Sequence, residues 1–254
     1  MKGCLNVLLL CFSIALFSQE LYTPRYIYSE TIQNDSLKNT DNIYFFYLKP
    51  IQYIGNLKKE ITLEYTESDR YSKILKNNYR SSNFKELNKE FMSRYYEGIM
   101  IFVDTTQKTP LKRKELDTLK ISSEEYDAKI DSINYGLKIT HPIPYITTYY
   151  DGFPVTIRNV GNRESIIGFG NNAALELEAL DKENIWQKIY PYPHYSCGTG
   201  IQFFVLKPGE IATVFEPRLN GNFHTNFRYR LGNIVSNEFE GNINYNYIKQ
   251  ERSD

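Results

Sequence analysis

The chain has few cysteines, few histidines and no excess of either charge. Three residues of each of the first two types occur among 254 residues, and Cys4 and Cys11 both lie in an N-terminal apolar segment. If that segment is removed, Cys197 is the one cysteine left. It cannot form an intrachain disulfide, so we expect the fold to rest on its hydrophobic core. Lysine plus arginine equal aspartate plus glutamate at 30 each, which excludes a nucleic-acid partner held by bulk charge.

Long apolar runs are also scarce, and the one that stands out lies at the N-terminus. Lys2 precedes an uncharged segment from Leu5 to Phe17, and Ser18 provides a small residue before a cleavage position. About a dozen apolar-biased residues fit a signal peptide and fall short of the roughly 20 that span a membrane. We predict that residues 1–18 are a signal peptide and that no transmembrane helix remains after cleavage. The alternative is a retained N-terminal anchor helix.

Strand and helix patterns alternate between residues 19 and 149, which predicts an α+β region. Apolar and aromatic patterns indicate strands over residues 42–48, 51–54, 57–66 and 99–103, with a turn signal at Gly55-Asn56. Helical spacing indicates a first helix that buries Phe84, Leu87, Phe91 and Tyr95 and ends at Gly98. A second helix begins at Ser122, buries Tyr126, Ile130 and Ile133, and ends at Gly136.

Two prolines in His141-Pro142-Ile143-Pro144 mark a boundary. Beyond it, short apolar segments alternate with turn clusters at about 8–12-residue spacing, which is typical of a β-sandwich. The expected strands cover residues 155–160, 165–169, 173–180, 185–189, 201–206, 210–215, 223–231 and 241–248. We therefore predict an all-β immunoglobulin-like sandwich over residues 150–250, following the α+β region at 19–149.

Several short motifs lie between residues 154 and 248. They are Ile157-Arg-Asn-Val-Gly161, Leu175-Glu-Leu-Glu-Ala179, Trp186, Leu206-Lys-Pro-Gly-Glu210, Phe227-Arg-Tyr-Arg230 and Asn237-Glu-Phe-Glu-Gly241. In these motifs the segment resembles the immunoglobulin-like C-terminal domain of uncharacterised exported proteins from Gram-negative bacteria. The resemblance implies a sandwich fold and an exported location, and it implies no catalytic residues.

Only a few residues of the chain could serve metal or thiol chemistry. His194 and Cys197 are separated by two residues, and His141 and His224 occur elsewhere. Zinc sites in proteins need three or four converging ligands, so this pair is half a site. A cysteine nucleophile would need a nearby histidine and a third, orienting group. We favour a loop histidine and a buried structural cysteine, and we predict no catalytic residue, metal or cofactor.

Two further patterns have a structural and a functional interpretation. Glu176 and Glu178 lie two apart on a strand and so share one face, which we interpret as solvated surface rather than as a glycosidase carboxylate pair. The chain has 22 tyrosines. Two clusters of them either pack in sheets or form a stacking platform for sugars or peptides. These clusters are Tyr145/Tyr149/Tyr150 and Tyr190/Tyr192/Tyr195.

Four triplets of Asp, then Ser or Thr, then an apolar residue or threonine resemble the acceptor of a bacterial periplasmic O-glycosylation system. The hydroxyls concerned belong to Ser36, Thr105, Thr118 and Ser132. The alternative is that Asp-Ser and Asp-Thr pairs serve in turns and helix caps.

Together these patterns predict an exported bacterial envelope protein located in the periplasm, on the outer surface or outside the cell. We expect a non-enzymatic binding or structural protein whose partner is a protein or glycan of the envelope. The competing hypothesis is a secreted hydrolase with a Cys/His site or a site between the two regions.

Overall fold

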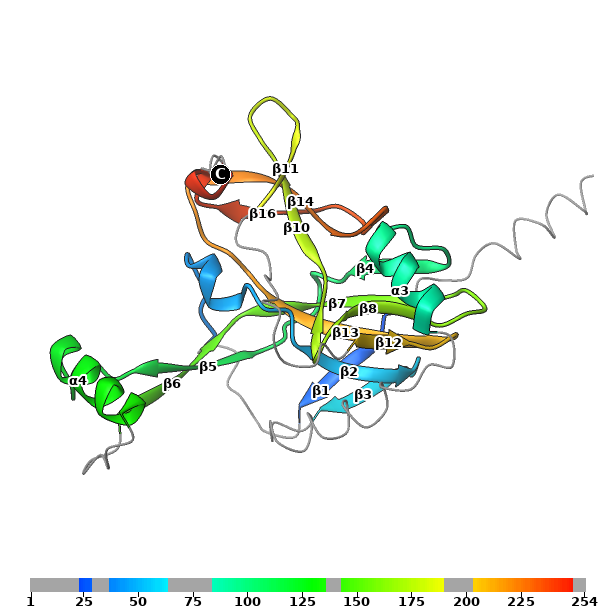
Figure 1. The fold of residues 1–254 in the computed structure, drawn as a ribbon. Coiled ribbons are helices and arrows are strands. Elements are labelled where there is room, and N and C mark those ends of the chain that lie inside the picture. Colours follow the sequence, from blue (N-terminus) through cyan, green and yellow to red (C-terminus); the bar gives the residue numbers. More distant parts are fainter. Residues whose placement is uncertain (1–22, 29–36, 64–83, 136–142, 190–202, 249–254) are drawn as a thin grey trace, which may run out of the picture.

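The computed structural model describes residues 23–28, 37–63, 84–135, 143–189 and 203–248 (Figure 1). Strands make up most of the regular structure, so the protein is β-rich. No helix in these described ranges is long and apolar enough to cross a membrane. The predicted signal peptide at residues 1–18, together with His141, His194 and Cys197, lies outside the described residues.

A four-stranded antiparallel sheet forms the centre of the fold. Its strand order is β2 (Ile51–Asn56), β13 (Glu210–Pro217), β7 (Gly152–Asn159) and β4 (Ile99–Val103). Nearly every residue of β7 and β13 is buried, because side chains are covered on both faces of the sheet. β2 and β4 precede the proline-containing segment at 141–144, whereas β7 and β13 follow it. The sheet therefore joins strands from both sides of that segment.

A second antiparallel sheet packs over one face of the central sheet (Figure 1). It contains β11 (Trp186–Lys188), β10 (Glu176–Leu180), β14 (Phe223–Leu231) and β15 (Ile234–Val235), and β16 (Phe239–Ile243) pairs with the first half of β14. One hydrophobic core includes residues from both sheets. Among its members are Val155, Ile157, Val214, Leu177, Phe227 and Tyr229.

Smaller elements cover the remaining faces. The parallel pair β1 (Arg25–Tyr28) and β3 (Glu60–Leu63) packs against Ile211 and Phe215 on the other face of the central sheet. Helix α3 (Phe84–Ser93) places Leu87 against the sheet of β12 (Phe203–Leu206), β8 (Ser165–Phe169) and β9 (Asn172–Ala173).

A two-stranded ribbon with a helix at its end extends away from these layers (Figure 1). It consists of β5 (Leu111–Leu116), helix α4 (Ser123–Asn134) and β6 (Tyr145–Tyr150). The predicted start of α4 is confirmed, since the backbone N–H of Glu125 donates to the Ser122 hydroxyl at 3.2 Å. Tyr126 and Ile130 are only half-buried, however, because the helix lies away from the core.

Two local backbone features explain where predicted elements differ from observed ones. Residues 42–48 do not form a strand. They contain the 3-10 helix η2 (Ile43–Phe46), in which the Asn42 side chain accepts a hydrogen bond from the backbone of Tyr44 at 3.0 Å. Helix α3 ends before Gly98, because Arg94 adopts a φ of 54°. This early end leaves Tyr95, which was expected to be buried, 59% exposed.

Candidate functional site: a cavity between the two sheets

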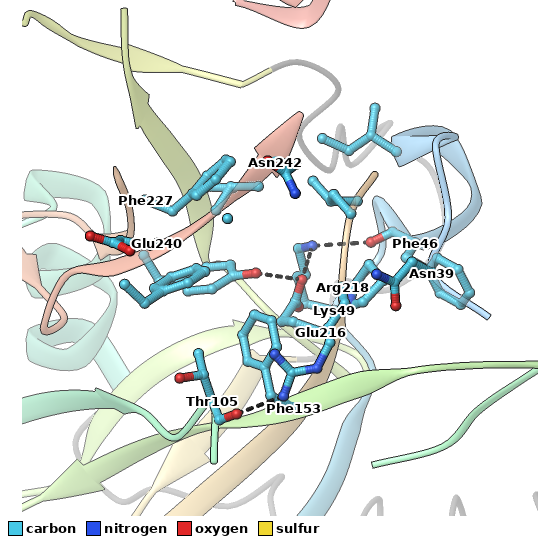
Figure 2. A pocket seen from close by; sticks show the side chains of 17 residues that line it. Asn39, Phe46, Lys49, Thr105, Phe153, Glu216, Arg218, Phe227, Glu240 and Asn242 are labelled. Atoms are coloured by element: carbon cyan, nitrogen blue, oxygen red, sulfur yellow. Dashed lines mark hydrogen bonds and ion pairs between the residues drawn. The ribbon is translucent and has the colours of Figure 1, made fainter. Parts of the chain in front are cut away.

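A cavity of about 170 Å³ lies between the end of β13, the strands β14 and β16, and the segment around η2 (Figure 2). Its rim reaches the surface at Asn39, Glu240 and Asn242, which are exposed. We call it the inter-sheet cavity. Its lining residues are Asn39, Ile43, Phe46, Lys49, Thr105, Phe153, Leu177, Glu216, Pro217, Arg218, Leu219, Phe227, Tyr229, Phe239, Glu240, Gly241 and Asn242.

Aromatic rings form one wall of the inter-sheet cavity. Phe227 and Tyr229 are two residues apart on β14 and therefore point to the same face of the sheet. The ring of Phe239 stacks on both, with centroids 5.6 Å from Phe227 and 5.9 Å from Tyr229. Phe153 of the central sheet meets the Phe239 ring edge-on at 5.2 Å. Such aromatic pairs stabilise the packing beyond the area that they bury, so this wall is preformed.

A buried ion pair lies beside the aromatic wall. The Lys49 amine donates to Glu216 Oε2 at 2.5 Å and to the carbonyl oxygen of Phe46 at 3.0 Å. The Tyr229 hydroxyl donates to the same Glu216 oxygen at 2.9 Å. The side chains of Lys49 and Glu216 are only 8% and 2% exposed. Their charges therefore compensate each other inside the protein, as buried charges require.

Burial sets the acid–base properties of this pair. Desolvation raises the pKa of Glu216 above its usual value, although the Lys49 charge and the hydrogen bonds from Lys49 and Tyr229 oppose this shift. Desolvation also raises the pKa of the Tyr229 phenol well above its usual range, and the negative charge of Glu216 acts in the same direction. Tyr229 therefore stays neutral and serves as a hydrogen-bond donor.

A second cation in the cavity wall is also paired. The Arg218 guanidinium lies 3.3 Å from Asp151 Oδ2 and donates to the carbonyl oxygen of Thr105 at 2.6 Å. Its centre lies 5.5 Å from the centroid of the Phe153 ring. Both cations in the wall thus have a carboxylate partner, and the interior of the inter-sheet cavity carries no net charge.

Polar groups at the rim and in the wall of the cavity keep bonding capacity for a ligand. The Asn242 amide uses Oδ1 toward His224 Nδ1 at 3.1 Å, and Figure 2 shows its nitrogen directed toward the cavity. The Asn39 side chain donates from Nδ2 to Asn220 Oδ1 at 3.3 Å, which leaves the side-chain oxygen Oδ1 of Asn39 available as an acceptor. Lys49 has three N–H donors, and only two of them meet acceptors in the described part of the chain. The arrangement can therefore hold a molecule that offers both donors and acceptors.

The histidine that the sequence singled out and the structure describes lies on the surface. The His224 side chain is 64% exposed, and its Nε2 lies 3.7 Å from Glu240 Oε2. No group of three or more metal-ligating side chains forms within the described residues. The proposed partners of His224 in a metal or thiol site, at positions 141, 194 and 197, are not described.

The two glutamates of β10 do not lie on a solvated face. Glu178 is buried, and its oxygens accept from Arg228 Nε at 2.6 Å and from Arg230 Nε at 2.5 Å. Glu176 pairs with Arg94 at 2.7 Å and with Lys188 at 2.6 Å. The expectation of solvated surface is wrong because the cross-strand neighbours are cationic, a feature that the strand's own sequence does not contain. Both carboxylates cross-link the sheet.

The glycosylation candidates differ in access. Thr118 is exposed in a turn, next to Leu119, which is 97% exposed. Thr105 is half-buried, and Ser132 is half-buried with its hydroxyl donating to the Ala128 carbonyl at 2.9 Å. Ser36 lies outside the described residues. Solvent access alone thus favours Thr118 as a glycosylation site among the three described hydroxyls.

Apart from the glycosylation candidate Thr105, the residues that build the inter-sheet cavity were not predicted as site residues. One signal was present, since Glu216 is a charged residue directly after the apolar run Ile211–Phe215, where a buried strand was expected. A buried carboxylate at the end of such a strand needs a hydrogen-bonding or cationic partner, but the neighbouring sequence does not indicate which residue that partner is. Comparisons with protein-family models, curated proteins and solved structures find no match to this chain. The chemistry of the cavity is therefore the basis for interpreting its role.

Proposed function

We propose that this chain is an exported, non-enzymatic binding protein of the bacterial envelope that holds a ligand in the inter-sheet cavity. Export is supported by the order of Lys2, an apolar run and Ser18 at the N-terminus. The packing of two antiparallel sheets around one core supports an immunoglobulin-like sandwich. On this proposal the α+β elements before residue 150 complete the sandwich and one side of the cavity.

The observation that carries the proposal is the composition of the cavity wall. Ligand sites are concave and mostly apolar, with a few polar groups that orient the ligand. Here an aromatic wall centred on Phe239 faces a small set of polar ends from Lys49, Asn39 and Asn242. Because Glu216 already accepts hydrogen bonds from Lys49 and from the neutral Tyr229 hydroxyl, these three side chains fix the shape of the site. The partner we propose is a protein or glycan of the envelope.

A second candidate is a secreted hydrolase with its site between the two regions. One observation favours it: Lys49 and Thr105 come from the first region, whereas Glu216 and Tyr229 come from the second, and all four line the inter-sheet cavity. The raised pKa of Glu216 is also a property of general acids. The test must therefore separate binding from turnover.

The mature chain, residues 19–254, can be incubated with an extract of its own cell envelope that contains proteins, glycans and small molecules, then washed, denatured and analysed by mass spectrometry. A binding protein returns the retained compound unchanged, and the compound left in solution also stays intact. Asn242→Trp, which places a bulky ring at the rim, should reduce retention, whereas Asn246→Trp, on the exposed surface outside the cavity, should not. Depletion of the compound with the appearance of cleavage products would favour the hydrolase. Equal retention by all three proteins would exclude the inter-sheet cavity as the binding site.

A further inference from the structure

The volume of the inter-sheet cavity limits the ligand to a single small ring. The cavity measures about 170 Å³. An engineered apolar cavity of roughly 150 Å³ in another protein accepts benzene, which sets the scale for one six-membered ring. Because Asn39, Glu240 and Asn242 reach the surface, further parts of a larger molecule can continue outward past the rim. The part inside the cavity is therefore one ring, either free or at the end of a chain.

The charges in the wall exclude a charged ring. Lys49 is compensated by Glu216, and Arg218 is compensated by Asp151. A carboxylate or ammonium group on the ligand would lose its hydration on entering the cavity, and no unpaired opposite charge in the interior would compensate it. The desolvation of such a group costs free energy of binding. Glu240 lies at the rim rather than in this interior, and its side chain is 77% exposed, so water solvates its charge. The ring that enters is therefore electrically neutral.

The polar groups exclude a purely apolar ring. A ring such as benzene would fill the space against Phe153, Phe227 and Phe239 but would leave the remaining N–H of the buried Lys49 without water or partner. Hydroxyl groups both donate and accept, so they suit a site that presents amide oxygen, amide nitrogen and ammonium donors together. A ring with C–H faces and hydroxyls around its edge satisfies both walls.

We infer that the inter-sheet cavity binds a neutral pyranose ring, either free or at the end of an envelope glycan. The C–H face of the sugar packs on the ring of Phe239, and its hydroxyls bond with Lys49, Asn39 and Asn242. The inference rests on the proposed binding function and gives that site a ligand class. It also selects a glycan rather than a protein from the two partner classes.

The inference is tested by titrating the isotope-labelled mature chain with small probes and following amide shifts by NMR. The neutral probes are methyl glycosides of a hexose, a deoxyhexose and an N-acetylhexosamine. The matched probes are methyl glucuronide, which adds a negative charge, and phenol, which keeps a ring and one hydroxyl. At least one neutral glycoside should shift amides of β14 and β16, at lower concentration than glucuronide or phenol.

Two variants assign the binding to the cavity rim. Asn242→Ala should weaken binding of the neutral glycoside by about 5–10-fold, the equivalent of one lost hydrogen bond. Asn246→Ala removes an exposed amide outside the cavity and should leave the affinity within about twofold of the unaltered chain. Amide spectra without probe check that both variants are folded.

The outcomes separate the ligand class from the binding function. If phenol shifts the cavity amides and no neutral glycoside does, the sugar inference is overturned while the proposed binding function stands. If glucuronide binds more tightly than the neutral glycosides, the argument from paired charges is wrong. If no probe shifts these amides and the envelope extract also leaves nothing bound, both the inference and the proposed function fail.

Discussion

Replacing Lys49 by methionine tests whether the buried ion pair sets the stability of the cavity. Methionine fills a similar volume but removes the positive charge, so Glu216 would remain buried with only the Tyr229 hydroxyl as a partner. A buried carboxylate without a cation partner takes up a proton, because the neutral acid avoids the free energy of burying an unpaired charge. The expected loss of stability is therefore limited by the free energy of protonating a carboxylate at the working pH.

The magnitude follows from the ordinary acidity of glutamate. Protonating a carboxyl group with a pKa of about 4.3 at pH 7 costs about 3.7 kcal/mol, and at about pH 5.5 it costs about 1.6 kcal/mol. The sign follows from what Lys49 does in the parent, where its charge and hydrogen bond oppose the burial that raises the pKa of Glu216, so that removing Lys49 raises this pKa further. A carboxyl group with a raised folded-state pKa contributes stability below its ordinary pKa and loses it as pH rises through the raised value. Lys49→Met should therefore cost up to about 3.7 kcal/mol at pH 7 and about 2 kcal/mol less at about pH 5.5.

Urea unfolding of a protein that comprises residues 19–254 measures these differences at both pH values. Lys112→Met, at an exposed position of β5, is the matched control and should stay within about 0.5 kcal/mol of the parent. The double variant Lys49→Met/Glu216→Gln removes both charges and keeps an acceptor for Tyr229, so it should recover most of the loss. A cost for Lys49→Met that is the same at both pH values, or no recovery in the double variant, would refute this account of the pair.

Three other expectations can be checked with simple variants or with the native protein. Glu178→Gln should cost about 1–3 kcal/mol, since two arginines lose their buried carboxylate partner. Burial alone would raise the pKa of Glu178, but its arginine partners outweigh burial and lower it. The difference from the parent should therefore be largest above the ordinary carboxyl pKa and fade in acid unfolding curves as pH falls through the lowered value. Gly168→Ala should lower the melting temperature far more than Gly170→Ala. At position 168 the new Cβ would lie 1.9 Å from a backbone oxygen of β9. At position 170 the new Cβ meets nothing within 4 Å, and only the backbone φ of +54° disfavours alanine. Edman sequencing of the native protein should begin after residues 1–18, and a sequence starting at the initiator methionine would contradict export by cleavage.

Local patterns predicted many of the elements because each depends on neighbouring residues. The apolar runs at Ile99–Val103 and Ser165–Phe169 form β4 and β8 as expected, and Ser122 caps α4. The prediction failed over residues 42–48, where aromatic content indicated a strand but the Asn42 side chain stabilises a 3-10 helix. In that segment a side chain that bonds its own backbone outweighed β propensity.

Pairing over long distances in sequence could not be predicted in the same way. β2 pairs with β13, and Lys49 pairs with Glu216 across 167 positions of the chain. Neither local context names the other residue as its partner, because Lys49 precedes Pro50 in an irregular segment and Glu216 precedes Pro217 at the end of a strand. The inter-sheet cavity depends on these pairings, so its lining residues gave only one visible signal, the charge at position 216.

The same pairings connect the proposed site to the whole chain. β7 and β13, both from the second region, are bordered by β4 and β2 from the first, which satisfies the backbone groups at both edges of this strand pair. Without these two strands the edges would be open, and without Lys49 the buried Glu216 would have no cation partner. The sandwich proposed for residues 150–250 therefore needs strands from before residue 141, and any ligand held beside Lys49 and Glu216 contacts both regions at once. Binding would then stabilise the association of the two regions by mass action, since the ligand has its full site only when they are docked.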